Sequence, residues 1–200
     1  MTKSQVCAND IAALVRARNP LLWVVTREEA RVERYLIEAS AAAGYVPRTW
    51  DIGQGVAELG GQPAQIGGQD PGETLAAIRE RAESGSERGV WIMRDLPAWL
   101  GDPVGTITRR QLRNLARMLP GAPRSSAQAI IVLTTVADVP PDLAGHATVI
   151  EWPMPDREEI AAILDETLNM QPEKIRDTAL NGNRDAAIDA AVGGLQAGQA

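Results

Sequence analysis

Residues 21–36 read LLWVVTREEARVERYL and hold two adjoining patterns that decide the fold class. Residues 21–25 are apolar without alternation, which predicts a strand over 21–26 that is buried on both faces. From residue 27 the apolar positions recur every three or four residues, which predicts a helix over 27–42 that ends at Gly44. The inward face of this helix would consist of Val32, Tyr35, Leu36 and Ala39. A buried strand that leads straight into an amphipathic helix is typical of a parallel α/β sheet.

Strand and helix patterns alternate from this unit to about residue 152. Further strands are expected at 45–52, 89–96, 129–135 and 147–152, and further helices at 9–18, 73–84 and 106–119. Pro47 indicates an edge or irregular strand, and the glycine-rich residues 53–72 indicate a long loop. Beyond residue 152 only helices are expected, the first opened by Asp156 as its cap. We therefore predict a five-stranded parallel sheet with helices on both faces, followed by a helical segment.

The turn after the first strand lacks the residues of a phosphate loop. It reads Thr26-Arg27-Glu28-Glu29, and no GxxxxGK followed by Ser or Thr occurs anywhere in the chain. The only lysines, Lys3 and Lys174, precede the first strand and follow the last, so neither can reach phosphates at a strand-to-helix turn. Two glutamates favour the start of a helix but would repel a triphosphate. The turn therefore predicts a helix start rather than a nucleotide site.

The composition excludes several other classes of function. The net charge of -6 and the pI near 4.9 argue against general binding of nucleic acid or of anionic membranes. Cys7 and His146 are the only cysteine and histidine, so neither an internal disulfide nor a zinc site of thiolates and imidazoles can form. No stretch has the pattern of a signal peptide or a membrane span. We expect a soluble, cytoplasmic protein without a metal site.

Two strand ends carry polar residues of the kind that contact nucleotides. The 89–96 strand ends near Asp95, as a Walker B strand ends in the carboxylate that holds Mg²⁺. Arg94 precedes this acid and no second acid follows it, which favours a structural salt bridge. The 129–135 strand ends in Thr134 and Thr135. Asp95, Thr134 and Thr135 are therefore vestigial candidates for cofactor binding, and no catalytic residue is predicted.

Four arginines line one side of the predicted 106–119 helix, opposite its apolar face. They are Arg109, Arg110, Arg113 and Arg117. One interpretation is a solvated helix face paired with some of the acidic residues. The other is an interaction face for an acidic partner surface or a nucleic acid backbone.

Residues 129–160, AIIVLTTVADVPPDLAGHATVIEWPMPDREEI, contain a strand that ends in two threonines, a proline-rich turn, a short strand and a capped helix. This order resembles the second half of an AAA+ ATPase core, with its sensor-1 strand, last core strand and helical lid. Residues 15–32, VRARNPLLWVVTREEARV, are similar to the run IRARxPLLxVVTxEExRV of the N-terminal region of Ycf46-like AAA+ ATPases. Trp50 and the pair Arg94-Asp95 match two further positions of that family.

The resemblance implies a P-loop NTPase or RecA-like α/β sandwich that lacks its P-loop. Residues 1–152 would be a degenerate AAA+ domain, and residues 153–200 a lid-like helical segment that is cut short. The resemblance also implies a bacterial or phage parent protein with an active AAA+ module downstream, which would hold ATP and Mg²⁺. The segment where an arginine finger would lie contains His146 and no arginine.

The expected function is therefore that of a non-catalytic assembly or docking domain. Without Walker A, with an altered Walker B and without the arginine finger, this chain is not expected to be an enzyme or to bind a cofactor. Its partners would be the downstream module and other proteins, with neither membrane nor nucleic acid expected. Two alternatives remain open. Nucleotide could still bind through Asp95, Thr134 and the glycine loop, or the helix from Arg109 to Arg117 could bind nucleic acid or an acidic partner.

Overall fold

The computed structural model of the chain describes all residues except 102, 104, 173–182 and 198–200. It divides into two compact units, Ala8–Trp152 and Met1–Cys7 together with Pro153–Ala200. Helix α1 (Lys3–Arg16) begins in the smaller unit and continues in the larger one. Each unit is described by itself.

The larger unit is built on a six-stranded mixed sheet in the order β3-β2-β4-β5-β1-β6. The strands are β1 (Leu21–Val25), β2 (Val46–Asp51), β3 (Gly55–Ala57), β4 (Gly89–Met93), β5 (Gln128–Thr134) and β6 (Thr148–Glu151). All neighbours are parallel except β2 and β3, which are antiparallel. The α/β class with a mostly parallel sheet is therefore confirmed, whereas the predicted five-stranded, wholly parallel sheet omitted the antiparallel strand β3.

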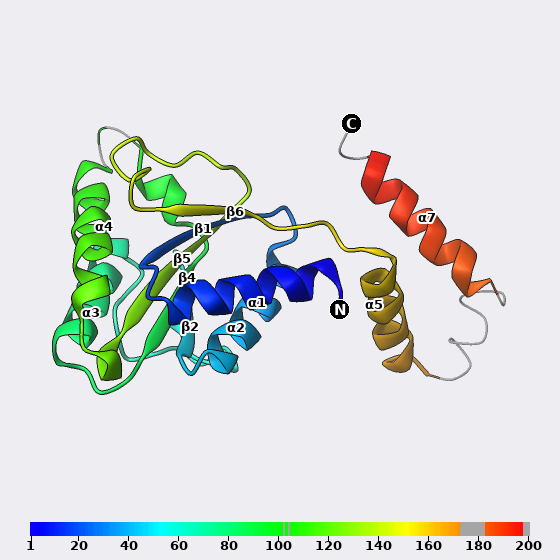
Figure 1. The fold of residues 1–200 in the computed structure, drawn as a ribbon, viewed down its shortest axis with the longest axis horizontal. Coiled ribbons are helices and arrows are strands. Elements are labelled where there is room, and N and C mark those ends of the chain that lie inside the picture. Colours follow the sequence, from blue (N-terminus) through cyan, green and yellow to red (C-terminus); the bar gives the residue numbers. More distant parts are fainter. Residues whose placement is uncertain (102, 104, 173–182, 198–200) are drawn as a thin grey trace. The chain divides into compact units, whose positions relative to one another are not determined.

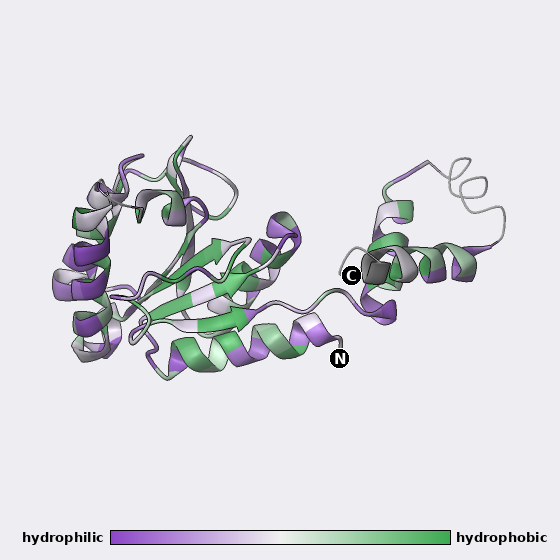
Figure 2. Cartoon of the chain, turned by 90° about the horizontal axis from the view of Figure 1, so that it is seen from above, coloured by the Kyte–Doolittle hydropathy of each residue, from purple (hydrophilic) through white to green (hydrophobic). Residues whose placement is uncertain are grey.

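Helices cover both faces of this sheet (Figure 1). They are α1, α2 (Glu29–Ala42), α3 (Pro71–Ser84) and α4 (Thr106–Met118), with short 3-10 turns at Leu96–Trp99, Leu119–Gly121 and Arg124–Ser126. Alternate residues of β1 show the two sides: Trp23 belongs to the core under α3 and α4, whereas the equally buried Val24 points to the side of α1 and α2. In Figure 2 the strands are mostly hydrophobic, and the helices carry hydrophilic residues on their outer surfaces.

Two further predictions about the larger unit are corrected by the structure. Strand β2 is not an edge strand, because it lies between β4 and β3. Pro47 is tolerated there because only Thr49–Asp51 of β2 pair with β3, so its missing N–H falls outside that ladder. The glycine-rich loop also contains β3, whose three residues are too few to produce a periodic pattern. Its glycines permit sharp turns, such as the one at Gly55 with φ of 76°.

Helix α1 starts at Lys3, six residues before the predicted start. Thr2 and Gln5 form a reciprocal cap: the Thr2 Oγ1 accepts from the Gln5 amide at 3.2 Å, and the Gln5 Oε1 accepts from the Thr2 amide at 2.9 Å. This Thr-x-x-Gln capping box sets the helix start at Lys3, ahead of the apolar pattern that predicts a start at residue 9.

The smaller unit contains α5 (Arg157–Asn169) and α7 (Arg184–Ala197), which pack against each other. The predicted cap is confirmed, because the Asp156 Oδ1 accepts from the Glu159 amide at 3.0 Å. Ion pairs join the two helices, from Arg157 to Asp185 and Asp189 and from Arg184 to Asp165. The helical pattern expected over residues 173–180 lies outside the described residues.

Candidate functional site

The carboxyl ends of the parallel strands meet at one edge of the sheet. The register pairs Val25 of β1 with Thr134 of β5, and Met93 of β4 with Val132 of β5. The residues that follow β1, β4 and β5 therefore gather at neighbouring positions. In open α/β sheets, ligands bind outside this edge, so it is the candidate nucleotide site of this fold.

The turn between β1 and α2 occupies the part of this edge where a phosphate loop would lie. Only three residues connect the two elements. The Thr26 amide donates to the Thr134 carbonyl at 2.8 Å, and the Glu28 amide donates to the Thr26 Oγ1 at 3.0 Å. Glu28 in turn pairs with Arg31 at 2.6 Å. Two of the amides of this turn are thus already engaged, and a phosphate here would face the carboxylates of Glu28 and Glu29.

Arg94, directly after β4, is the centre of an ion-pair network. Its Nε and Nη2 donate to the two carboxylate oxygens of Glu33 on α2, at 2.6 and 3.1 Å. Its Nη1 donates to the Asp51 Oδ2 at the end of β2, at 3.0 Å. Burial alone would lower the pKa of Arg94, but the hydrogen bond and charge of Glu33, together with the charges of Asp51 and Glu29, outweigh it and raise that pKa. The guanidinium is therefore a fixed positive charge that links α2, β2 and β4.

The three vestigial candidates lie at this same edge but serve different contacts. The Asp95 Oδ2 accepts from the Ile52 amide at 3.3 Å, so this half-buried carboxylate holds the residue after β2. The Thr134 Oγ1 accepts from the Val136 amide at 3.4 Å, within the turn that follows β5. Thr135 is exposed. The side chains of Asp95 and Thr134 therefore each accept a hydrogen bond from a backbone amide at this edge.

Glu33 and Asp51 are the site residues that sequence reasoning missed. The salt bridge of Arg94 was predicted, but its partners lie 61 and 43 positions away in the chain. A weak signal exists for Glu33, which lies one helical turn after Glu29 on α2. No pattern in the sequence marks Asp51 as the third member.

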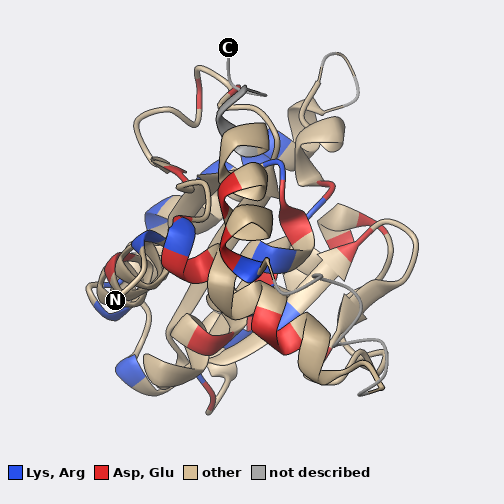
Figure 3. Ribbon diagram, turned by 90° about the vertical axis from the view of Figure 1, so that its right-hand side faces the viewer, with Lys and Arg blue, Asp and Glu red and all other residues tan. Residues whose placement is uncertain are grey.

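Two of the four arginines of α4, Arg109 and Arg113, are half-buried, and the other two are exposed. Arg109 donates to the Leu100 carbonyl and lies 3.8 Å from Asp142. The exposed arginines are Arg110 and Arg117. Figure 3 shows acidic and basic segments scattered over the ribbon, whereas helix α4 contains four arginines and no acidic residue.

Among the described residues, no group of three or more His, Cys, Asp or Glu side chains could hold a metal ion. Within the same residues no helix has the length and apolarity that a membrane span requires. His146 is half-buried, and its amide donates to the Leu143 carbonyl at 2.8 Å within the turn before β6.

Comparison with known proteins gives two kinds of similarity. Residues 7–152 match the family described as SpoVK-like AAA ATPase, N-terminal domain. The chain is also similar to two proteins named "Uncharacterized AAA domain-containing protein ycf46". It is 26% identical to that of Guillardia theta over 162 residues and 26% identical to that of Pyropia yezoensis over 153 residues. Each alignment covers 76% of this chain but only 28% and 29% of the relatives, and both organisms are algae.

Proposed function

We propose that this chain, which belongs to the family of SpoVK-like AAA ATPase N-terminal domains, is a non-catalytic docking or assembly domain. In this proposal it keeps the α/β scaffold of a nucleotide-binding module and uses the surface for contacts with proteins. Hydrolysis of ATP, with its Mg²⁺, takes place in a separate AAA+ module downstream in the parent protein.

The observation that carries the proposal is the Arg94 network at the carboxyl edge of the sheet. A Walker B carboxylate holds Mg²⁺ at the end of its strand. Here a guanidinium follows that strand and is bound by Glu33 and Asp51. Both carboxylate oxygens of Glu33 and the Oδ2 of Asp51 accept from this guanidinium, and the Asp51 Oδ1 accepts from the Gln54 amide, so neither carboxylate is left free to hold a divalent cation. The carboxylates of Glu28 and Glu29 in the turn after β1 would repel the phosphates of a nucleotide.

The relatives support the division of labour between two modules. This chain aligns with 28% and 29% of their lengths, so most of each relative lies outside the region of similarity. The second unit, with α5 and α7, would take the place of an AAA+ lid in this arrangement. We place the working protein in the cytoplasm, where ATP is supplied.

A calorimetric titration with Mg-ATP and Mg-ADP tests the proposal. The expected result is no binding tighter than a Kd of about 1 mM, which corresponds to about -4 kcal/mol. Saturable binding with a micromolar Kd and a stoichiometry near one would overturn it.

The second candidate function is residual nucleotide binding. It is favoured by the position of Asp95 and Thr134, which lie at the edge where ligands bind in this class of sheet. The same titration distinguishes the two, and the variant Asp95→Asn identifies the site. If nucleotide binds to the wild type and the variant binds at least tenfold more weakly, the second function holds.

A further inference from the structure

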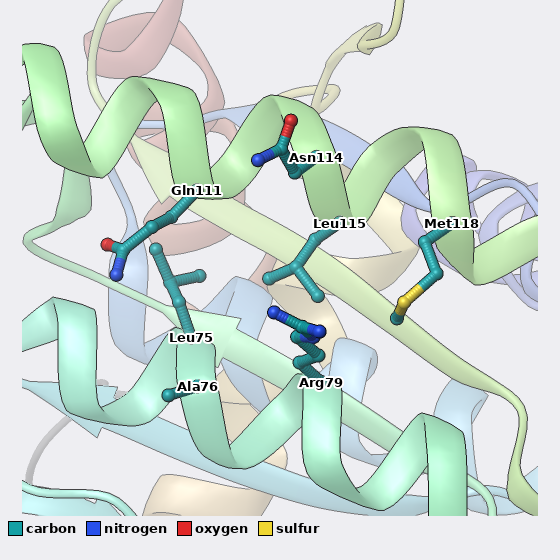
Figure 4. A pocket seen from close by; sticks show the side chains of 7 residues that line it. All are labelled: Leu75, Ala76, Arg79, Gln111, Asn114, Leu115 and Met118. Atoms are coloured by element: carbon teal, nitrogen blue, oxygen red, sulfur yellow. The ribbon is translucent and has the colours of Figure 1, made fainter.

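Outside the sheet edge, helices α3 and α4 flank a groove with a volume of about 360 Å³. Figure 4 shows Leu75 and Arg79 of α3 facing Gln111, Leu115 and Met118 of α4. The aliphatic side chains form its floor and Met118 one end. Methionine adapts its shape to different apolar partners, which suits a binding surface.

One polar atom in this groove has no partner. The Gln111 Oε1 is buried and accepts no hydrogen bond from the described residues. Buried carbonyl oxygens are normally satisfied, and an unsatisfied one costs about 1–3 kcal/mol. A donor from a bound molecule would remove that cost, so the groove has a polar anchor as well as an apolar floor.

The α4 side of the groove carries uncompensated positive charge. Arg110 and Arg117 lie on one stripe of α4, two turns apart and about 10 Å along its axis, with the exposed Asn114 between them at the rim. Neither arginine makes an ion pair with any residue that the structure describes. Helix α4 itself contains four arginines and no acidic residue, in a chain whose net charge is -6.

The α3 side differs in charge. There Arg79 is neutralised by Glu83 at 2.9 Å, and both side chains are exposed. The two sides of the groove are therefore unequal, with positive charge along α4 and a closed ion pair along α3. An occupant with carboxylates along one flank would be oriented by this difference.

We propose that the groove between α3 and α4 binds an acidic amphipathic helix of a partner protein. Aliphatic side chains of that helix lie on Ala76 and Met118, above the buried Leu115. Its carboxylates, about two turns apart, pair with Arg110 and Arg117. A helix laid between two others buries its apolar face in the way common to helix-in-groove recognition. This inference rests on the proposed docking function and names the surface and the partner's chemistry.

A peptide is favoured over nucleic acid by the same features. Nucleic acid binding depends on several cations that follow the backbone, and this surface offers two exposed arginines in an acidic chain. An aliphatic floor adds nothing to a phosphate backbone but stabilises a leucine side chain by about 1.5–3 kcal/mol on full burial.

The test uses fluorescence anisotropy with a labelled 14-residue peptide, EELLEALEELLEAL. Its controls are the same design with lysine in place of every glutamate, and a 14-nucleotide single-stranded DNA. We expect the acidic peptide to bind with a Kd of about 1–100 μM and the basic peptide not to bind. The double variant Arg110→Glu, Arg117→Glu should weaken binding at least tenfold. The charge-matched double variant Arg16→Glu, Arg88→Glu, at exposed positions outside α3 and α4, should change it less than twofold.

The groove itself is tested by Met118→Glu, which should weaken binding at least fivefold, with the exposed Met170→Glu as control. Circular dichroism checks that every variant is folded. A Kd above 1 mM, equal losses in the two arginine variants, or wild-type affinity in Met118→Glu would each overturn the proposal. Tighter binding of DNA with the same arginine dependence would overturn it in favour of a nucleic acid surface. None of these probes is Mg-ATP or Mg-ADP, so these failures leave the non-catalytic function standing, and a Mg-ATP site would overturn that function alone.

Discussion

Replacement of Arg94 by methionine should destabilise the larger unit by about 2–3 kcal/mol. Methionine keeps the aliphatic length and removes the guanidinium. The side chains of Arg94, Glu33 and Asp51 are 25%, 18% and 20% exposed, so their pairs lie between the surface and buried cases. Exposed pairs contribute about 0.2–1 kcal/mol, and removal of one partner from a buried pair costs about 3–5 kcal/mol. The expected loss lies between these limits, because the substitution removes three hydrogen bonds of 2.6–3.1 Å and leaves the two carboxylates facing each other without a cation.

Urea unfolding followed by tryptophan fluorescence measures this loss. All five tryptophans lie within Ala8–Trp152, so the signal reports this unit and not the smaller one. With a denaturant slope of about 1–3 kcal/mol per M, the midpoint should fall by roughly 1–2 M. The matched control is Arg79→Met, which breaks a pair whose members are 66% and 51% exposed and should cost less than about 0.5 kcal/mol. A midpoint for Arg94→Met within error of this control would show that the Arg94 network contributes no more stability than an exposed ion pair.

Three further predictions concern caps, packing and backbone. The Asp156 carboxylate accepts hydrogen bonds from the Lys3 amide and from the Glu159 amide at the start of α5, and these bonds lower its pKa. Asp156→Ala should therefore lower the free energy of unfolding by about 1 kcal/mol near pH 7, measured by thermal melts in circular dichroism. Because the folded-state pKa is depressed, that stabilisation is present above the ordinary aspartate pKa and lost as pH falls through the folded value, so a constant difference down to the lowest pH would contradict it. Leu112→Ala, at a fully buried position, should cost about 2–5 kcal/mol in urea unfolding, against less than about 0.5 kcal/mol for the 72% exposed Ile107→Ala. Gly67→Ala should lower the free energy of unfolding by about 1–2 kcal/mol in the same assay, because φ is 67° and the new Cβ would lie 2.8 Å from the Thr74 Oγ1. An unchanged midpoint would show that the loop relaxes.

The sequence predicts the parallel part of the sheet because its central strands are unbroken apolar runs. The run 21–26 becomes β1, and the run 129–135 becomes β5, each within one residue. Helix α3 likewise follows from the spacing of Leu75, Ile78 and Ala82, all buried. Strand β3 could not be predicted in this way, because three residues with Gly55 among them depend on pairing with β2 rather than on their own pattern.

The candidate site is also predictable only in part, because its central contacts join residues that are far apart in the chain. The acidic turn and the lack of a lysine at it are local facts of the sequence. The network around Arg94 depends on which strands are neighbours, since β2 and β4 are adjacent in the sheet but lie far apart in the chain. Glu33 reaches it only because α2 packs over β2 and β4. Ion pairs of this kind depend on which strands are neighbours in the sheet, and the spacing of residues along the chain does not reveal them.

The central claim, that the carboxyl edge of the sheet holds an ion pair in place of a nucleotide, is tested most directly by two-dimensional NMR. The spectra of the ¹⁵N-labelled chain would be followed during a titration with Mg-ATP, at the amides of Thr26, Arg27 and Glu28 and at the Arg94 Nε. If the ion pair occupies this edge, these four signals do not move in a saturable way up to millimolar Mg-ATP, and the Arg94 Nε signal stays sharp and shifted by its carboxylate partners. Saturable shifts of the three amides, together with a change at the Arg94 Nε, would show instead that nucleotide enters this edge.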